Sequence, residues 1–211
     1  LKILMKIIKN FVKSILYKTS KFYLIKIFFA RYKNNSVIFC LHRVLPDNLR
    51  KKEKSKNLDF ILTTDYFENF IIDIKKKFKF VELKTLINNK NPNKKICHLT
   101  FDDGYIDNLI YALPIIKKYK VPCTIYISDN YMNKNSRVKN FLCANNHNDF
   151  MSWNEVRTLI KSKLVTIGCH TTNHLELSKL NKKKIYEEIY FSKKNIEKNI
   201  GKKVVDFANP Y

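Results

Sequence analysis

The sequence predicts an α/β fold in which strands alternate with helices, as in a parallel sheet or a (β/α) barrel. From residue 37 onward, short apolar runs alternate with longer stretches whose apolar residues recur at helical spacing. Several apolar runs are followed at once by Asp, His or Asn. Because the carboxyl ends of parallel strands lie at one face, both observations favour a parallel sheet with a polar site at that face.

The expected elements follow one another in a regular order. Strands are expected at residues 37–41, 96–101, 122–128, 164–169 and 204–208, with a further short run at 80–83. Helices are expected at residues 64–77, 108–118, 153–162 and 182–200. Residues 88–95 and the Asn-rich stretch 130–150 are expected to form polar connections.

Residues that start or stop helices lie at the expected places. Thr64 can cap the first helix, and Ser152 with Glu155 forms a capping box at the third. Pro114 predicts a kink or break in the second helix. Gly201 lies at the natural C-terminal stop of the fourth.

Residues 1–36 differ from the rest of the chain, since they hold nine Lys or Arg and no acid. Apolar residues recur at helical spacing up to position 16, and lysines fall on the opposite side, which predicts a basic amphipathic helix. Three interpretations stay open: contact with an anionic membrane surface, packing on the chain's own domain, or a degenerate signal sequence. We therefore divide the chain into this segment and a domain at 37–211.

Composition limits the class of protein. The 211 residues include 41 Lys+Arg against 18 Asp+Glu, a net charge of +23, and 45% are hydrophobic, which excludes collagen-like and disordered chains. The charge suits an anionic partner, or reflects a lysine-rich composition alone. No nucleic acid is expected, because recognition motifs are missing from the sequence. No stretch reaches about 18 uncharged apolar residues, so no conventional transmembrane helix is expected.

The five cysteines form no Cys-x-x-Cys pair, and their number is odd, so neither a disulfide framework nor a Cys-rich zinc site is expected. Four of them lie in apolar runs. We expect these four to be small buried core residues: Cys40, Cys97, Cys123 and Cys169.

The residues that can carry chemistry follow predicted strands. Asp102 and Asp103 follow the strand at 96–101, and His170 follows the strand at 164–169, with His174 four residues later. One carboxylate with two imidazoles forms a ligand set that suits a catalytic metal ion. A turn loosened by Gly104 lets both carboxylates reach one centre, and the second is then free to act as a general base.

Other polar residues follow the remaining strands or lie apart. His42 and Arg43 follow the strand at 37–41, and His42 is either at the rim of the site or in the core. Tyr211 ends the Asn-Pro-Tyr turn that follows the strand at 204–208. His98 lies within a strand and is expected to be structural, and His147 has no assigned role.

Three segments resemble motifs of the NodB-type polysaccharide deacetylases. Residues 100–105 (TFDDGY) resemble the first motif, 170–174 (HTTNH) the second, and 207–211 (FANPY) the start of the third. Residues 40–44 (CLHRV) and 151–153 (MSW) are similar to segments of one branch. The motifs occur in the family's order, and the resemblance covers about residues 37–211.

The resemblance implies a distorted parallel (β/α) barrel that removes N-acetyl, or sometimes O-acetyl, groups from a polysaccharide of the cell envelope. Asp102 would be the general base. Asp103, His170 and His174 would hold a divalent metal, typically zinc. The backbone N–H of Tyr211 would help to bind the oxyanion. The resemblance leaves open whether the chain is cytoplasmic or exported.

Two departures from the family pattern are expected to matter. Ala208 stands where the third motif often carries an Arg that orients the base. The sequence stops at Tyr211, before the segments that in the family supply a general-acid His and the last strands. We therefore expect a C-terminally truncated domain with an incomplete barrel, low activity and poor stability. The alternative is a catalytically inactive remnant that acts at most as a basic envelope or membrane-surface protein.

Overall fold

The computed structural model describes residues 36–53, 57–91, 93–133, 144 and 147–211. The expected amphipathic helix at the N-terminus lies outside these residues. Ser36–Tyr211 forms one unit of the structure, and the description below concerns that unit.

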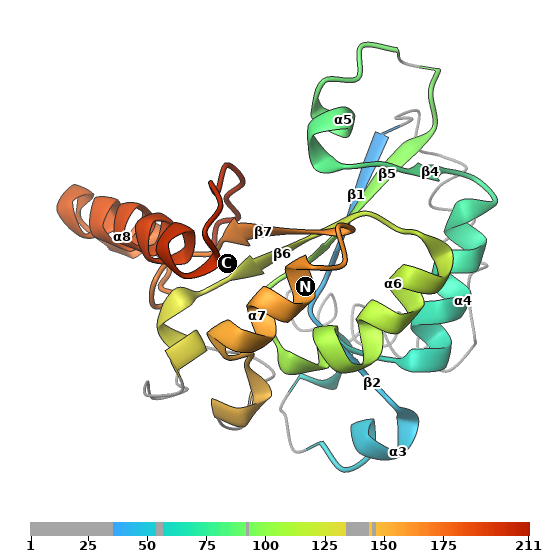
Figure 1. Ribbon diagram of the computed structural model, residues 1–211, viewed down its shortest axis with the longest axis horizontal. Coiled ribbons are helices and arrows are strands. Elements are labelled where there is room, and N and C mark those ends of the chain that lie inside the picture. The colour runs from blue at the N-terminus through green and yellow to red at the C-terminus, as the bar shows by residue number, and fades with distance from the viewer. Residues whose placement is uncertain (1–35, 54–56, 92, 134–143, 145–146) are drawn as a thin grey trace, which may run out of the picture. The chain divides into compact units, whose positions relative to one another are not determined.

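A parallel sheet forms the centre of this unit (Figure 1). Its strands, in spatial order, are β1 (Ser36–Leu41), β5 (Ile96–Phe101), β6 (Cys123–Ile127) and β7 (Val165–Cys169). A short strand, β4 (Lys79–Phe80), pairs with the start of β5. Two further strands, β2 (Arg43–Leu45) and β3 (Ile61–Thr63), form a separate parallel pair. The structure thus confirms the α/β class with a parallel sheet.

The strand register brings the carboxyl ends of the central strands to one edge. Leu41 lies beside Phe101, and Phe101 lies beside Ile125. Ile127 lies in turn beside Cys169. Residues that directly follow β1, β5, β6 and β7 are therefore neighbours, as the sequence predicts for a polar site.

The central strands are apolar because they are covered on both faces. Every residue of β5 and β6 is buried, which is typical of parallel strands packed between helices. Cys97, Cys123 and Cys169 are buried in this core, as expected.

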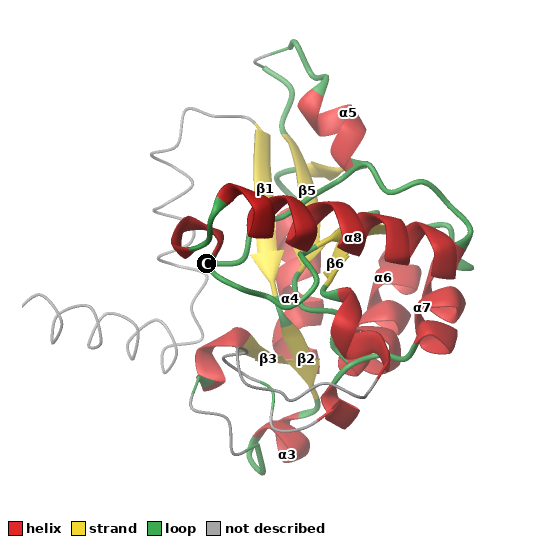
Figure 2. Cartoon of the chain, turned by 90° about the vertical axis from the view of Figure 1, so that its left-hand side faces the viewer, coloured by secondary structure: helices red, strands yellow, loops and turns green. Residues whose placement is uncertain are grey.

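Helices connect the strands and cover the sheet. They are α3 (Asp47–Arg50), α4 (Thr64–Lys75), α5 (Leu83–Ile87), α6 (Leu113–Tyr119), α7 (Trp153–Ile160) and α8 (Lys182–Ile200). Figure 1 shows α4, α6 and α7 along one side of the sheet and α8 beyond β7. Figure 2, turned by 90°, shows α8 in front of the strands and α4, α6 and α7 behind them.

Helix ends agree with the sequence in most cases. Ser152 Oγ accepts from the Glu155 backbone N–H while the Glu155 carboxylate accepts from the Ser152 N–H, so the capping box is present. Gly201 ends α8 in the left-handed conformation, at φ 67°. The cap of α4, however, is Thr63 rather than Thr64, because it is the Thr63 hydroxyl that accepts from the Tyr66 N–H. At Pro114 the expected break is a π-helical turn, Asn108–Ala112, followed by α6.

The structure differs from the sequence expectations at three places, two in strands and one in the burial of a cysteine. Residues 204–208 form no regular strand: they make one parallel bridge, between Cys169 and Phe207, and the Val204 N–H donates to the Glu197 side chain. The run at 80–83 divides between the end of β4 and the start of α5. Cys40 is exposed, because β1 lies at the edge of the sheet formed by the described residues.

Within the part of the chain that the structure describes, no helix has both the length and the apolarity needed to cross a bilayer.

Candidate metal centre and active site

Asp103, His170 and His174 meet at the carboxyl edge of the sheet. Asp102 and Asp103 directly follow β5, and the Asp102 N–H continues the ladder by donating to the Leu41 carbonyl at 2.9 Å. The His170 N–H donates likewise to the Ile127 carbonyl at 3.0 Å. Hydrogen bonds of the sheet therefore fix the backbone at Asp102, directly before Asp103, and at His170.

The three side chains form a tight, buried cluster. Oδ1 of Asp103 lies 3.1 Å from Nε2 of His174 and 3.4 Å from Nε2 of His170. The two imidazole ring centroids are 4.9 Å apart. Around a tetrahedral zinc ion with bonds of about 2.0–2.1 Å, neighbouring ligand atoms are roughly 3.3 Å apart. The observed separations match that spacing, and the cluster can hold a divalent cation.

The hydrogen bond of His170 leaves one ring nitrogen available to bind a cation. Its Nδ1 donates to the Ala208 carbonyl at 3.0 Å, so the neutral ring carries its lone pair on Nε2, which faces the Asp103 carboxylate. Two acceptors that face each other need a proton or a metal ion between them. Burial lowers the pKa of His170, but Asp103, Asp102 and the Ala208 carbonyl together raise it above its ordinary value.

The pKa of Asp103 shifts in the direction that favours its charged form. Burial alone would raise its pKa, but the interactions with the His170 and His174 imidazoles outweigh burial and hold the pKa of this carboxyl well below its usual range. Asp103 is therefore a carboxylate at neutral pH, which is the form that binds metal ions.

Unusual backbone conformations concentrate at this site. The left-handed region is adopted by Asp103 (φ 75°), Thr171 (φ 67°), His174 (φ 52°) and Tyr211 (φ 66°). Each non-glycine residue held there costs on the order of 1–3 kcal/mol, and such strain is common at functional sites. Gly104 (φ 76°) completes the turn, and a Cβ at this position would lie 2.8 Å from Cγ2 of Ile127.

The neighbouring carboxylate, Asp102, points to a different partner. Its Oδ2 accepts a hydrogen bond from the Cys40 thiol at 3.1 Å, while its Oδ1 is buried without a hydrogen-bond partner among the described residues. The two adjacent carboxylates therefore have separate surroundings. The sequence interpretation missed this contact because nothing in residues 37–41 distinguishes Cys40 from a core cysteine.

The last residues of the chain lie against the histidines. The Cys169 N–H donates to the Asp206 carbonyl and the Ala208 N–H donates to the Cys169 carbonyl, which brings the Ala208 carbonyl to His170. The Tyr211 ring lies 5.2 Å, between centroids, from the ring of His174, and is 64% exposed. Tyr211 thus lies beside the cluster.

A residue that the sequence did not single out holds the histidine loop in place. Glu188, buried in α8, accepts from the Asn173 N–H at 2.8 Å and from Asn173 Nδ2 at 2.6 Å. Its backbone carbonyl accepts from the Thr172 N–H at 3.1 Å. Thr171 Oγ1 accepts from the His174 N–H at 3.0 Å. The loop that carries both imidazoles is therefore fastened to α8.

The remaining candidate residues lie outside the cluster. His42 is half-buried and packs edge-on against Phe60. Arg43 is buried and pairs with Asp107 at 2.7 Å and Glu53 at 3.2 Å. His98 is a core residue, as expected from its place in a strand. His147 lies in a short 3₁₀ turn, His147–Asp149.

Comparisons with known proteins agree with the motifs. Residues 89–211 match the family described as polysaccharide deacetylase. Over 203 residues the chain is 30% identical to a poly-beta-1,6-N-acetyl-D-glucosamine N-deacetylase of Staphylococcus aureus, covering 86% of this chain and 66% of that relative. The chain thus spans just under two thirds of that relative's length.

Solved structures show the same fold. IcaB from Ammonifex degensii superposes with a TM-score of 0.67 at 22% identity, covering 84% of this chain and 75% of that one. A de-N-acetylase from Aggregatibacter actinomycetemcomitans gives a TM-score of 0.69 at 22% identity, covering 83% and 79%. From its family match and the fold, the chain belongs to the polysaccharide deacetylase family.

Proposed function

We propose that the chain carries the catalytic site of a metal-dependent deacetylase, which hydrolyses N-acetyl or O-acetyl groups on a cell-envelope polysaccharide. The observation that carries the proposal is the cluster of Asp103, His170 and His174 with Asp102 directly beside it. In this proposal the three clustered side chains bind the metal, with zinc as the expected ion.

The substrate class follows from the named relative. The Staphylococcus aureus protein is described as acting on poly-beta-1,6-N-acetyl-D-glucosamine, so an N-acetylated glucosamine polymer is the substrate to test first. We propose that the whole protein acts on such a polymer at the cell envelope.

The residues of the chain divide the chemistry between them. A divalent cation in the cluster would act as a Lewis acid toward the acetyl carbonyl and, if it is zinc, lower the pKa of a water molecule to about 7. Asp102, whose Oδ1 has no hydrogen-bond partner among the described residues, takes the proton of the attacking water as general base. The backbone N–H of Tyr211 donates to the oxygen that gains negative charge.

The positioning of these groups comes from contacts already described. The Ala208 carbonyl keeps the proton of His170 on Nδ1 and leaves Nε2 for the cation. The Cys40 thiol holds one oxygen of Asp102 and leaves the other for the proton transfer. Water attacks the acetyl carbon, the amine or alcohol leaves with a proton, and acetate is released.

The experiment measures acetate release from β-1,6-linked N-acetylglucosamine oligomers, with zinc or cobalt added and with the metal removed by chelation. We expect metal-dependent release that Asp102→Asn lowers by about 10²- to 10⁴-fold, the usual contribution of a general base. The matched control is Asp65→Asn, at an exposed acid in the first turn of α4. Acetate release that neither the chelator nor Asp102→Asn reduces would refute the proposal. The absence of any acetate release by the full-length protein would also refute it.

A further inference from the structure

A second feature lies at the opposite end of the strands. Lys79 begins β4 and residues 118–120 precede β6, and both strands run parallel to β5. A pocket of about 550 Å³ therefore lies at the amino ends of these strands. Asp103 and His170 of the candidate metal centre follow the carboxyl ends of β5 and β7, at the opposite end of the sheet. Its lining is lysine-rich: Lys75, Lys76, Lys77, Phe78, Lys79, Phe80, Lys118, Tyr119 and Lys120.

The charge of this lysine pocket is one-sided. Six of its nine lining residues are lysines and none is an acid. Lys76 pairs with Asp73 at 2.6 Å, and Lys118 pairs with Glu68 at 2.7 Å. The lining and these two acids together carry a net charge of +4. A concave surface with this excess concentrates anions, because the low-dielectric wall focuses the positive field.

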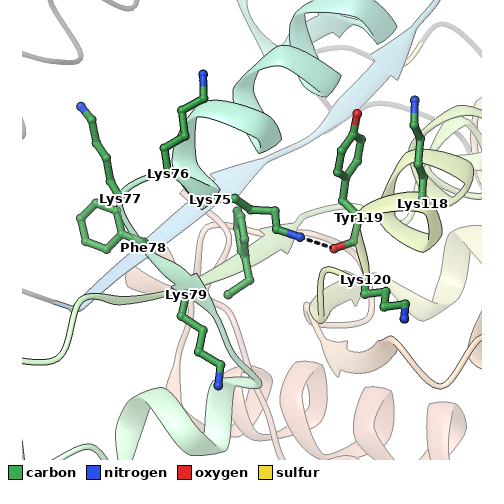
Figure 3. A pocket seen from close by; sticks show the side chains of 9 residues that line it. Lys75, Lys76, Lys77, Phe78, Lys79, Lys118, Tyr119 and Lys120 are labelled. Carbon is green, nitrogen blue, oxygen red and sulfur yellow. Dashed lines mark hydrogen bonds between the residues drawn. The ribbon is translucent and has the colours of Figure 1, made fainter.

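The arrangement of the lysines indicates the kind of anion. Figure 3 shows the two lysine-bearing segments on either side of the pocket, with Lys75 reaching across to the Tyr119 carbonyl, a hydrogen bond of 2.8 Å. The other ammonium groups are spread around the rim instead of meeting at one point. Separated cations match repeated anionic groups along a chain better than one small anion.

The apolar residues of the pocket argue against a lipid bilayer. Phe78 and Phe80 are each only 9% exposed, so little of either ring is available at the surface of the pocket. No large apolar side chain of the lining is exposed, although membrane-surface binding uses such side chains to enter the lipid. The pocket is also concave, whereas a bilayer presents a broad surface.

We propose that the lysine pocket binds a polyanionic polymer, a chain of closely spaced phosphate or carboxylate groups, and so tethers the domain by the end opposite its candidate metal centre. The active-site face stays free for its own substrate in this arrangement. The proposal is independent of the proposed deacetylase activity, because it uses neither the metal cluster nor Asp102.

The test measures binding of fluorescently labelled inorganic polyphosphate and of poly-L-glutamate to the full chain by anisotropy, in the presence of EDTA. The pocket variant is Lys77→Gln with Lys79→Gln and Lys120→Gln. The control removes three exposed lysines from α8 and the turn after it: Lys183→Gln with Lys198→Gln and Lys202→Gln. Both variants have the same net charge and keep the basic residues 1–35.

We expect the pocket variant to weaken binding of at least one polymer by tenfold or more, and the control by less than threefold. The slope of log affinity against log salt should fall by about 2 to 3 in the pocket variant, at roughly 0.7–0.9 for each of the three lost lysine contacts. The double charge reversal, Lys79→Glu with Lys120→Glu, should weaken binding further. Whether polyphosphate or polyglutamate responds identifies the anionic group.

Two results would overturn the proposal. Equal losses in the pocket variant and the control would mean that the lysines act only as diffuse charge. A loss of binding to vesicles of phosphatidylglycerol and phosphatidylcholine in the pocket variant, with polymer binding unchanged, would assign the surface to a membrane.

Discussion

The thiol of Cys40, at the edge strand β1, donates a hydrogen bond to Oδ2 of Asp102 at 3.1 Å. The contact joins residues that are 62 positions apart in the chain. It occurs because Cys40 pairs in register with Thr100 on β5, two residues before Asp102. Although Cys40 is exposed as a residue, the surroundings of its sulfur are partly buried; this partial burial, and then the negative charge of Asp102, raise the pKa of Cys40 to about 12.

This contact predicts an unreactive thiol in an exposed residue. At pH 8 the Cys40 thiol stays protonated, and only the thiolate reacts readily with iodoacetamide. We expect alkylation of Cys40, followed by peptide mass spectrometry, to be at least a hundredfold slower in the native chain than in urea. Asp102→Asn should speed the native reaction. Equal rates in native and unfolded protein would show that the contact is absent.

The close packing around Gly104 predicts that one added methyl group at this position lowers stability strongly. Gly104→Ala forces Ala to φ 76° and brings its Cβ to 2.8 Å from Ile127. Gly201→Ala is the matched control, since Gly201 has a similar φ of 67° and nothing within 4 Å of the added Cβ. Urea unfolding should show a loss of about 1–2 kcal/mol for Gly201→Ala. Gly104→Ala should lose about 1–3 kcal/mol more, from overpacking. Equal losses would contradict the close approach to Ile127.

The contacts of Glu188 predict that a residue outside the candidate metal centre affects metal binding. Glu188→Ala removes the acceptor of two Asn173 hydrogen bonds and loosens the loop that carries His170 and His174. We expect zinc affinity, measured by competition with a chromophoric chelator, to fall by about 10- to 100-fold, as for other residues that orient metal ligands. The control is Glu187→Ala, beside it on α8. The Glu187 carboxylate pairs with Lys184 at 3.2 Å, so its loss should change zinc affinity little. Similar affinities for the two variants would refute this role.

His98 predicts a pH dependence of stability that is separate from the metal site. Its Nδ1 lies 2.7 Å from the Val81 carbonyl and its Nε2 lies 2.9 Å from Thr124 Oγ1, so the buried ring is held as a neutral tautomer. Burial lowers the pKa of His98 below the value of the unfolded chain. As pH falls through 6.5 and below, His98 is protonated in the unfolded state while it stays neutral in the folded state. The free energy of unfolding therefore falls.

The measurement is the free energy of urea unfolding between pH 8 and pH 5, in chelator. His98→Gln should be less stable than the wild type at pH 8 and should lose less stability on acidification. An unchanged slope in His98→Gln would contradict the account.

The sequence predicts the parts of the site that depend on topology. Asp103 and His170 directly follow apolar runs, and parallel strands bring such positions to one edge whatever the detailed packing. The exposure of Cys40 could not be predicted, because an edge strand and a central strand can have similar apolar runs. The roles of the Ala208 carbonyl and of Glu188 in positioning the histidines could not be predicted either, since both depend on contacts between segments distant in the chain.

The central claim is that Asp103, His170 and His174 bind one divalent metal ion. Titration of the metal-free chain with Co²⁺, followed by its visible absorption, measures this directly. We predict saturation at one equivalent with the absorption of a four- or five-coordinate site, and loss of that signal in His174→Ala, while His42→Ala keeps it. No saturable absorption in the wild type, or an unchanged titration in His174→Ala, would contradict the claim.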